Sequence, residues 1–283
     1  MRTGKYIFIA IPLTFLNVIC FCQQTKVPYG NNPAAGKYYT VRGIKIYTEV
    51  YGKGKPLLLI HGNGGSMNAF AFNIPYLSKK YKVIAVDSRA HGKTVDDQDS
   101  LSFEMMADDF AALLDSMHIN STYVIGWSDG GINALLLAIR HPDKVIKLVS
   151  SGANMSPDSS ALIPSEWKKE QKQYESDKNN PRTSPREKND WKIFLLDLLQ
   201  PNVPLDHLND IRCPSLIICG DNDLIQIEHT AAIYRHIPQA YLWILPHSGH
   251  ATLKEHSDDF NHMADSFFKE PFDTFGLSAG NRK

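Results

Sequence analysis

The stretch that decides the fold is YVIGWSDGGINALLLAIRHP, residues 123–142. Its first four residues are apolar, as in a buried strand, and residues 129–140 have the apolar spacing of a helix. Between them, residues 126–130 match the pattern G-x-S-x-G. A serine at such a strand-to-helix turn projects its hydroxyl clear of the sheet. The stretch therefore predicts an α/β fold and makes Ser128 a candidate nucleophile.

Short apolar runs recur on both sides of this turn, and each is typical of a strand buried on both faces. They are LLLI (57–60), VIAV (83–86), YVIG (123–126), VIKLVS (145–150), LIIC (216–219) and YLWIL (241–245). Helical patterns lie between them at 67–79, 101–118, 129–140, 226–236 and 254–269. The alternation predicts a doubly wound, mostly parallel sheet with its ligand site beyond the carboxyl ends of the strands.

Two segments depart from this alternation. Residues 37–51 alternate apolar and polar positions around an Arg-Gly pair, which predicts an N-terminal antiparallel hairpin. Residues 153–210 contain no strand pattern but two helical ones, 166–177 and 191–200, separated by a charged, proline-rich stretch. We expect this insertion to form a short helical cap.

The N-terminus has the layout of a secretory signal, with Arg2 and Lys5 before an apolar run that ends at Cys22. We expect a cleavable signal peptide and a secreted or periplasmic protein; the alternative is a membrane anchor formed by residues 6–22. The expected segments are a signal peptide (1–22), a flexible leader (23–36), an α/β core (37–152 and 211–270), a helical cap (153–210) and a C-terminal tail (271–283).

Charge and cysteine content argue against a nucleic-acid-binding protein and against a scaffold held together by disulfides. The 30 basic and 30 acidic residues give a formal net charge of +0, which offers no field for attracting nucleic acid. Outside the expected signal, only Cys213 and Cys219 remain, and both fall on one expected strand. Six residues of extended chain far exceed the span of a disulfide, so we expect buried free thiols.

A glycine-rich segment, HGNGG at 61–65, directly follows the strand expected at 57–60. A chain that turns tightly there leaves a backbone amide free for a developing oxyanion. We expect the N–H groups of Asn63 and Asp129 to form the oxyanion hole. A phosphate-binding loop is disfavoured because no G-K-[ST] follows.

A serine nucleophile needs a base, and the base needs a group that orients it. His250 lies in PHSGH, after the last expected strand, and is favoured as the base over His247. The segment LIICGDNDLI supplies the acid, and we choose Asp223 over Asp221, which is expected to bond the amides of its own turn. The order serine, acid, histidine is the one expected for a serine hydrolase on an α/β sheet.

Five motifs in order, HGNGG, DSRAHGKT, GWSDGG, GDND and PHSGH, resemble the α/β-hydrolase superfamily over residues 37–269. Within it, GWSDGGINALLLA and SGAN (151–154) are similar to the biphenyl-hydrolase-like branch, which includes valacyclovir hydrolase. In that branch the acid after the nucleophile is held to bind the α-ammonium of amino-acid esters, which implies this role for Asp129. The alternative is that Asp129 only caps the nucleophile helix. Ala90 departs from the superfamily, which more often has glycine there.

The expected function is hydrolysis of small carboxylic esters through an acyl-enzyme, with α-amino-acid esters as one candidate substrate class. The small-molecule ester is the only expected partner; no nucleic acid is expected, and a membrane only if the N-terminal segment is uncleaved. No cofactor and no metal are expected, because His61 and His91 lack accompanying ligands, and Arg89 is expected to bond loop carbonyls. Lactonase, C–C bond hydrolase and perhydrolase activities remain open on the same triad. A non-catalytic binding protein is the alternative of another class. Haloalkane dehalogenases and epoxide hydrolases are disfavoured because they use aspartate in place of Ser128.

Overall fold

The computed structural model describes residues 27–273. The expected signal peptide therefore lies outside the described residues, as do parts of the expected leader and tail. Between residues 27 and 273, no helix is both long and apolar enough to cross a bilayer.

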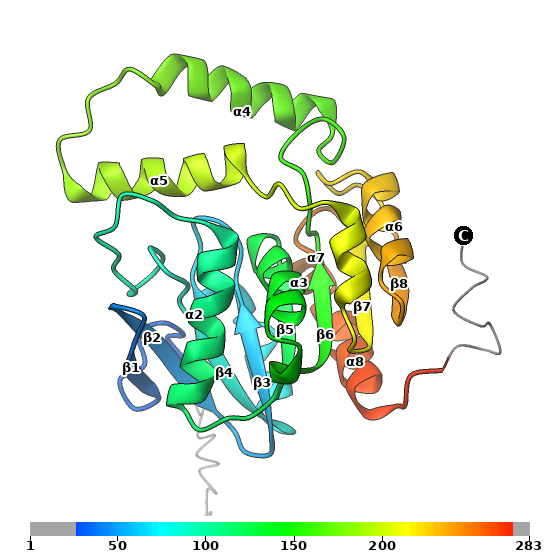
Figure 1. Ribbon diagram of the computed structural model, residues 1–283. Coiled ribbons are helices and arrows are strands. Elements are labelled where there is room, and N and C mark those ends of the chain that lie inside the picture. Colours follow the sequence, from blue (N-terminus) through cyan, green and yellow to red (C-terminus); the bar gives the residue numbers. More distant parts are fainter. Residues whose placement is uncertain (1–26, 274–283) are drawn as a thin grey trace, which may run out of the picture.

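An eight-stranded sheet forms the centre of the molecule, in the order β1-β2-β4-β3-β5-β6-β7-β8 (Figure 1). The strands are β1 Gly36–Val41, β2 Ile44–Tyr51, β3 Lys55–Ile60, β4 Tyr81–Val86, β5 Thr122–Trp127, β6 Val145–Ser151, β7 Ser215–Gly220 and β8 Ala240–Leu245. β2 pairs antiparallel with both β1 and β4, and all other pairs are parallel. The hairpin and the six strands are thus confirmed, but β8, at the edge of the sheet, is only partly buried.

Helices cover both faces of this sheet. They are η1 Met67–Phe70, α1 Ile74–Leu77, α2 Phe103–Ser116, α3 Asp129–Arg140, η2 Pro142–Lys144, α4 Pro164–Asp177, α5 Pro185–Leu199, η3 Leu205–Asp210, α6 Ile227–His236, α7 Thr252–Glu255 and α8 Ser257–Lys269. Two expected helices prove to be broken: 67–79 is split into η1 and α1, and 254–269 is interrupted at His256, whose φ and ψ are −125° and 48°. The helix expected at 191–200 begins earlier, at Pro185.

Two apolar layers hold the helices to the sheet. One packs α2, α3 and α6 against one face, and the other packs η1, α1 and α8 against the opposite face. Phe110 of α2 and Phe260 of α8 are fully buried in these layers. Burial of one such side chain contributes about 1.5–3 kcal/mol.

The two cysteines are buried and free, as expected. Cys219 lies in β7, but Cys213 precedes this strand, so placing both on one strand was wrong. Burial raises the pKa of each thiol to about 11, which keeps both protonated and unreactive at neutral pH.

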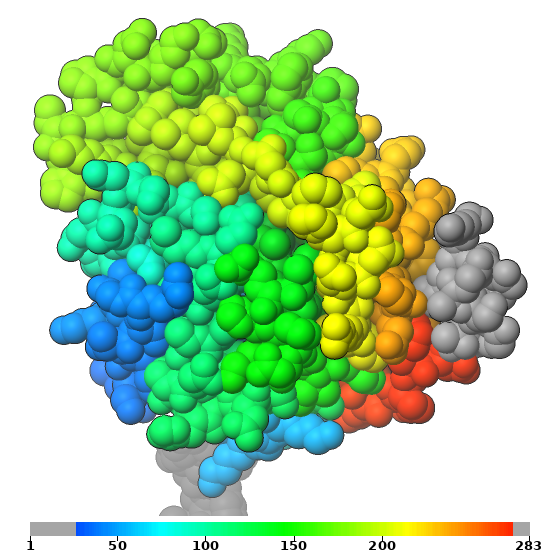
Figure 2. All heavy atoms as spheres, viewed as in Figure 1, coloured from blue at the N-terminus to red at the C-terminus, as the bar shows by residue number. Residues whose placement is uncertain are grey.

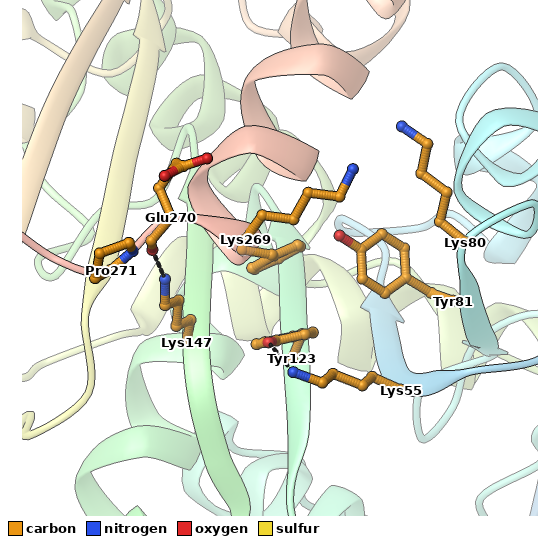
Figure 3. Close-up of a pocket in the computed structure, with 9 residues that line it drawn as sticks. Lys55, Lys80, Tyr81, Tyr123, Lys147, Lys269, Glu270 and Pro271 are labelled. Atoms are coloured by element: carbon orange, nitrogen blue, oxygen red, sulfur yellow. Dashed lines mark hydrogen bonds between the residues drawn. The ribbon is translucent and has the colours of Figure 1, made fainter.

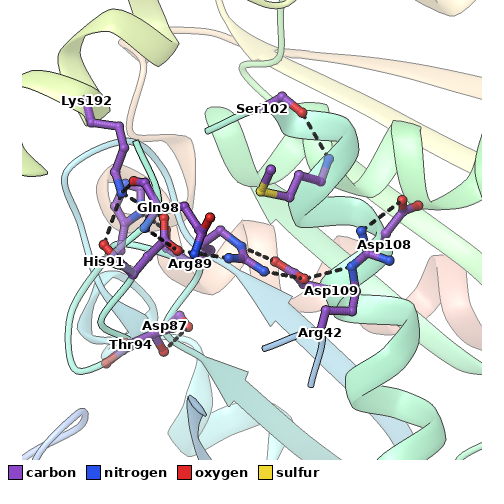
Figure 4. A network of polar contacts seen from close by, with 12 residues as sticks. Arg42, Asp87, Arg89, His91, Thr94, Gln98, Ser102, Asp108, Asp109 and Lys192 are labelled. Atoms are coloured by element: carbon purple, nitrogen blue, oxygen red, sulfur yellow. Dashed lines mark hydrogen bonds and ion pairs between the residues drawn. The ribbon is translucent and has the colours of Figure 1, made fainter. Parts of the chain in front are cut away.

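A buried ion-pair network joins α5 to the core (Figure 4). Arg89 donates from Nε to Asp109 Oδ2 at 2.6 Å and from Nη1 to Asp96 Oδ1 at 2.9 Å. Lys192 of α5 donates to the other oxygen of Asp96 at 2.7 Å. The expectation that Arg89 bonds loop carbonyls was wrong, because two buried carboxylates pair with its guanidinium.

The insertion after β6 carries α4 and α5, which lie above the carboxyl ends of the central strands (Figure 1). In the space-filling view its atoms cover this end of the molecule (Figure 2). Besides Lys192, Asn189 fixes α5 to the core by donating to the carbonyl of Ala90 at 2.8 Å. This arrangement places the two helices over the end of the sheet where a ligand site is expected.

Candidate active site

The turn between β5 and α3 holds Ser128 in a strained conformation, with φ 58° and ψ −124°. The two flanking glycines are required by close approaches of the backbone. A Cβ at Gly126 would lie 1.9 Å from the carbonyl oxygen of Gly130, and a Cβ at Gly130 would lie 1.9 Å from that of Ile60. The pattern G-x-S-x-G therefore has a steric cause, because a side chain at either glycine would clash with the backbone of this sharp turn.

The structure brings Ser128, His250 and Asp223 together from three separate loops. His250 follows β8, and its Nε2 lies 2.9 Å from Ser128 Oγ. Asp223 follows β7, and its Oδ1 lies 2.7 Å from His250 Nδ1. The Asp223 side chain is fully buried, and its Oδ1 also accepts from the amide of Ile225 at 3.1 Å. These contacts can orient the imidazole so that Nε2 faces the serine hydroxyl.

Several side chains that the sequence analysis missed fix the histidine loop. Trp127, beside the nucleophile, donates from its indole to the carbonyl of His250 at 2.8 Å. The carboxylate of Glu255 accepts from the amide of Gly249 at 2.6 Å and from the hydroxyl of Ser248 at 3.0 Å. The sequence shows that Glu255 lies five residues after His250, but only the fold shows that its carboxylate turns back onto the histidine loop.

The residues rejected as triad members have other contacts. Asp221 accepts at Oδ1 from the side-chain amide of Asn222, in its own turn, at 2.8 Å, and from the backbone amide of Ser248, in the histidine loop, at 3.1 Å. The expected bonding within its own turn is therefore only part of its contacts. His247 is exposed, with a positive φ of 54°, and its carbonyl faces the ring of His256 at 3.3 Å.

The glycine-rich loop after β3 lies beside the nucleophile, since a Cβ at Gly62 would be 2.8 Å from Ser128 Cβ. Within residues 27–273, the backbone N–H groups of Asn63 and Asp129 donate to no protein acceptor. The helix that begins at Asp129 adds the positive end of its dipole. Both amides are thus available for an oxyanion formed at Ser128.

Asp129 is buried, with a relative exposure of 3%. Its Oδ2 accepts from Asn63 Nδ2 at 2.9 Å, and the same amide donates to the carbonyl of Ile193 in α5 at 3.2 Å. Burial raises the pKa of Asp129 well above its usual value, and the charges of Asp197 and Glu170 raise it further. Asp129 therefore belongs to a group of carboxylates between the core and the cap.

The other two carboxylates come from the cap helices. Asp197 lies one turn after Ile193 in α5, and burial raises its pKa while the charge of His250 acts to lower it. Glu170 lies in α4, and burial, together with repulsion by Asp197, raises its pKa to about 7. Its Oε2 is buried without a hydrogen-bond partner among the described residues.

Within the part of the chain that the structure describes, no lysine or arginine forms an ion pair with Asp129, Asp197 or Glu170. Isolated buried carboxylates are costly, and such groups are commonly neutralised or paired. Asp129 is buried and the other two carboxylates are partly buried, and three such unpaired groups near a nucleophile favour a cationic ligand. Sequence reasoning singled out Asp129 only, because nothing in the pattern of residues 153–210 indicates which side chains face the core.

A mostly parallel sheet with a strained serine turn after β5 and acid and histidine loops after β7 and β8 has the architecture of the serine α/β-hydrolases. The sequence matches the alpha/beta hydrolase fold family over residues 55–176. The protein thus has the α/β-hydrolase fold and is a hydrolase.

Similar proteins cover several substrate classes. The chain is 27% identical to the serine hydrolase BPHL of Homo sapiens over 85% of this chain and 88% of that protein. It is 35% identical to 2-hydroxymuconate semialdehyde hydrolase of Pseudomonas sp. (strain CF600) over 44% of this chain and 45% of that one. Among solved structures, Est816, described as an N-acyl homoserine lactone degrading enzyme, superposes with a TM-score of 0.68 at 23% identity, covering 82% of this chain and all of its own.

Proposed function

We propose that the protein is a serine hydrolase that cleaves small carboxylic esters through an acyl-enzyme. The observation that carries this proposal is the hydrogen-bond chain from Ser128 Oγ to His250 Nε2 at 2.9 Å and from His250 Nδ1 to Asp223 Oδ1 at 2.7 Å. A serine hydroxyl is a weak nucleophile at neutral pH, and this arrangement supplies the base that removes its proton.

In the proposed reaction, Ser128 Oγ attacks the ester carbonyl while its proton passes to His250 Nε2. The tetrahedral oxyanion accepts hydrogen bonds from the amides of Asn63 and Asp129, and Asp223 stabilises the imidazolium. The C–O bond to the leaving alcohol then breaks, and the alcohol takes the proton from His250. Water, deprotonated by His250, attacks the acyl-enzyme and releases the carboxylic acid and free Ser128.

The acyl part of the substrate is proposed to carry an ammonium group, as in an α-amino-acid ester. The Asp129 carboxylate accepts from Asn63, in the glycine-rich loop beside Ser128, so we expect it to lie near an acyl group bound to Ser128 Oγ. Asp197 and Glu170 add negative charge on the cap side, and each of the three pKa values is raised in part by burial. A bound ammonium would offset this cost by pairing with the carboxylates.

Replacing Asp129 with asparagine is expected to remove the preference for amino esters. The test compares kcat/KM for valine p-nitrophenyl ester and its des-amino analogue in wild type and Asp129→Asn. We expect the amino preference to fall about 10- to 100-fold, the effect of losing one charge-assisted hydrogen bond, with the des-amino rate nearly unchanged.

Two results would speak against parts of this proposal. Equal wild-type rates on the two esters would remove amine recognition and leave a general esterase. If neither ester shows a rate that depends on Ser128, the proposal fails for esters, and lactones and C–C bonds become the substrates to test.

Glu170 is expected to make binding of the amino ester depend on pH. Its carboxyl becomes charged as the pH rises through about 7, so its attraction for an ammonium is absent near pH 5 and present near pH 8. We therefore expect the KM ratio of Glu170→Gln to wild type to rise several-fold between these pH values. Using the ratio cancels the titration of the substrate amine itself.

Glu170 is also expected to make the thermal stability of the protein depend on pH. Because the pKa of Glu170 is higher in the folded than in the unfolded chain, its ionisation destabilises the fold as the pH rises above about 4.5 and most strongly above 7. Glu170→Gln is thus expected to have a higher Tm than wild type near pH 8, with a smaller difference near pH 5. The same Tm difference at both pH values would contradict this placement of Glu170.

A further inference from the structure

A cavity lies at the amino ends of the parallel strands, whereas Ser128 lies at their carboxyl ends (Figure 3). Its volume is about 610 Å³, within the range of small-molecule sites. Tyr123, which lines it, is near the start of β5, whereas Ser128 directly follows the end of this strand. At about 3.3 Å per residue, roughly 16 Å of strand separates the two. The cavity is therefore distinct from the candidate active site.

Four lysines line this cavity: Lys55, Lys80, Lys147 and Lys269. Asp265 pairs with two of them and offsets one of their two charges, since its Oδ2 lies 2.5 Å from Lys80 Nζ and 2.8 Å from Lys269 Nζ. The remaining pair, Lys55 and Lys147, forms no ion pair with a carboxylate among residues 27–273. Burial lowers the pKa of Lys147 and the charge of Lys55 lowers it further, whereas the charge of Glu270, which also lines the cavity, acts to raise it.

Lys147 is held in place by backbone carbonyls. Its ammonium donates to the carbonyl of Phe267 at 2.8 Å and also to that of Glu270, at the end of α8. Lys55 donates to the hydroxyl of Tyr123 at 3.4 Å. An ammonium has three donors, so one on Lys147 and two on Lys55 remain for a ligand.

Aromatic rings form the wall between these two ammonium groups. Tyr123 stacks on Phe268 with ring centroids 4.6 Å apart and an interplanar angle of 15°. Tyr81 meets Tyr123 edge-on at 6.0 Å. In Figure 3 the ring of Tyr123 lies between Lys147 and Lys55. The cavity thus combines two unpaired positive charges with an apolar wall.

We propose that this cavity binds a phosphate monoester, with the phosphate between Lys55 and Lys147 and the organic part against Tyr123, Tyr81 and Pro271. The four lysines outnumber the carboxylates of Asp265 and Glu270 by two, so the site has a net charge that a dianion matches, and the dianion's oxygens can accept hydrogen bonds from the three remaining donors. The same phosphate chemistry occurs in soluble organic phosphates and in the headgroup of phosphatidic acid. Neither source requires the ester-cleaving site, so this binding is independent of the proposed catalysis.

The test measures binding of phenyl phosphate by calorimetry and binding to phosphatidylcholine vesicles, with and without phosphatidic acid, by co-sedimentation. It compares wild type, Lys55→Gln/Lys147→Gln and the control Lys168→Gln/Lys172→Gln, in which both lysines are exposed on α4. Unchanged circular dichroism and ester turnover check that each variant is folded. We expect the cavity variant to bind at least about tenfold more weakly and the control to bind as wild type, with binding weakened by added salt.

Loss of phenyl phosphate binding in the cavity variant alone would support a soluble phosphate, and loss of binding only to vesicles containing phosphatidic acid would support a lipid headgroup. Equal binding by wild type and the cavity variant would overturn the proposal. So would the absence of binding by wild type to either probe.

Discussion

Ser128→Ala is expected to lower kcat/KM for p-nitrophenyl esters by about 10⁴- to 10⁶-fold, to a residual rate set by the oxyanion hole and binding alone. The variant keeps Asn63 and Asp129 with their free amides but lacks the hydroxyl that is proposed to form the acyl-enzyme. The measurement is steady-state hydrolysis together with labelling by a fluorophosphonate probe, which should modify wild type and not the variant.

Ser159, exposed in the loop before α4, provides the matched control. Ser159→Ala should keep both the wild-type rate and the labelling, because this residue lies outside the triad. A Ser128→Ala variant that retains more than about one hundredth of the wild-type rate would exclude an acyl-enzyme at this serine. A wild type that neither labels nor hydrolyses any ester would indicate a hydrolase scaffold used for binding.

Local sequence was sufficient to predict the central part of the fold. The turn around Ser128 requires glycine for steric reasons that act over five residues, and the buried strands are short apolar runs whose burial does not depend on distant details. The loops after β7 and β8 then carry Asp223 and His250, because a parallel sheet brings the carboxyl ends of its strands to one edge.

The helical insertion was less predictable, and one signal in it was overlooked. Ser184 caps α5, Glu187 completes a capping box with it, and Pro185 occupies the first turn, which together mark a helix start at 185. The sequence analysis instead took this charged, proline-rich stretch as a separation between the two expected helices. The inward direction of Glu170 and Asp197 had no local signal, since it depends on how α4 and α5 pack over the core.

Ala90 shows a similar limit. It has a φ of 66°, a left-handed conformation that favours glycine and explains why this position is more often glycine in the superfamily. The carbonyl of Ala90 accepts a hydrogen bond from Asn189 of α5, so the strained turn also helps to hold the cap. The sequence showed the departure from the pattern but not the backbone conformation behind it.

Asp223→Asn is expected to lower kcat by about 10⁴-fold while leaving the fold intact. Asparagine has the same shape as aspartate, but its amide N–H can donate to His250 Nδ1, which favours the tautomer with the proton on Nε2. This tautomer cannot accept the proton of Ser128 Oγ, and the imidazolium also loses its stabilising charge. Steady-state kinetics and circular dichroism of the variant would separate loss of catalysis from loss of structure.

Asp221→Asn is the matched control, because Asp221 is two residues away and bonds the amide of Ser248, not the imidazole. We expect this variant to lose less than about tenfold in kcat, since an asparagine oxygen can still accept from that amide. Equal losses in the two variants would mean that the effect comes from the loop conformation and not from the charge on Asp223. A large loss confined to Asp223→Asn, with KM little changed, would place the function of this carboxylate in the transition state, where the imidazolium forms.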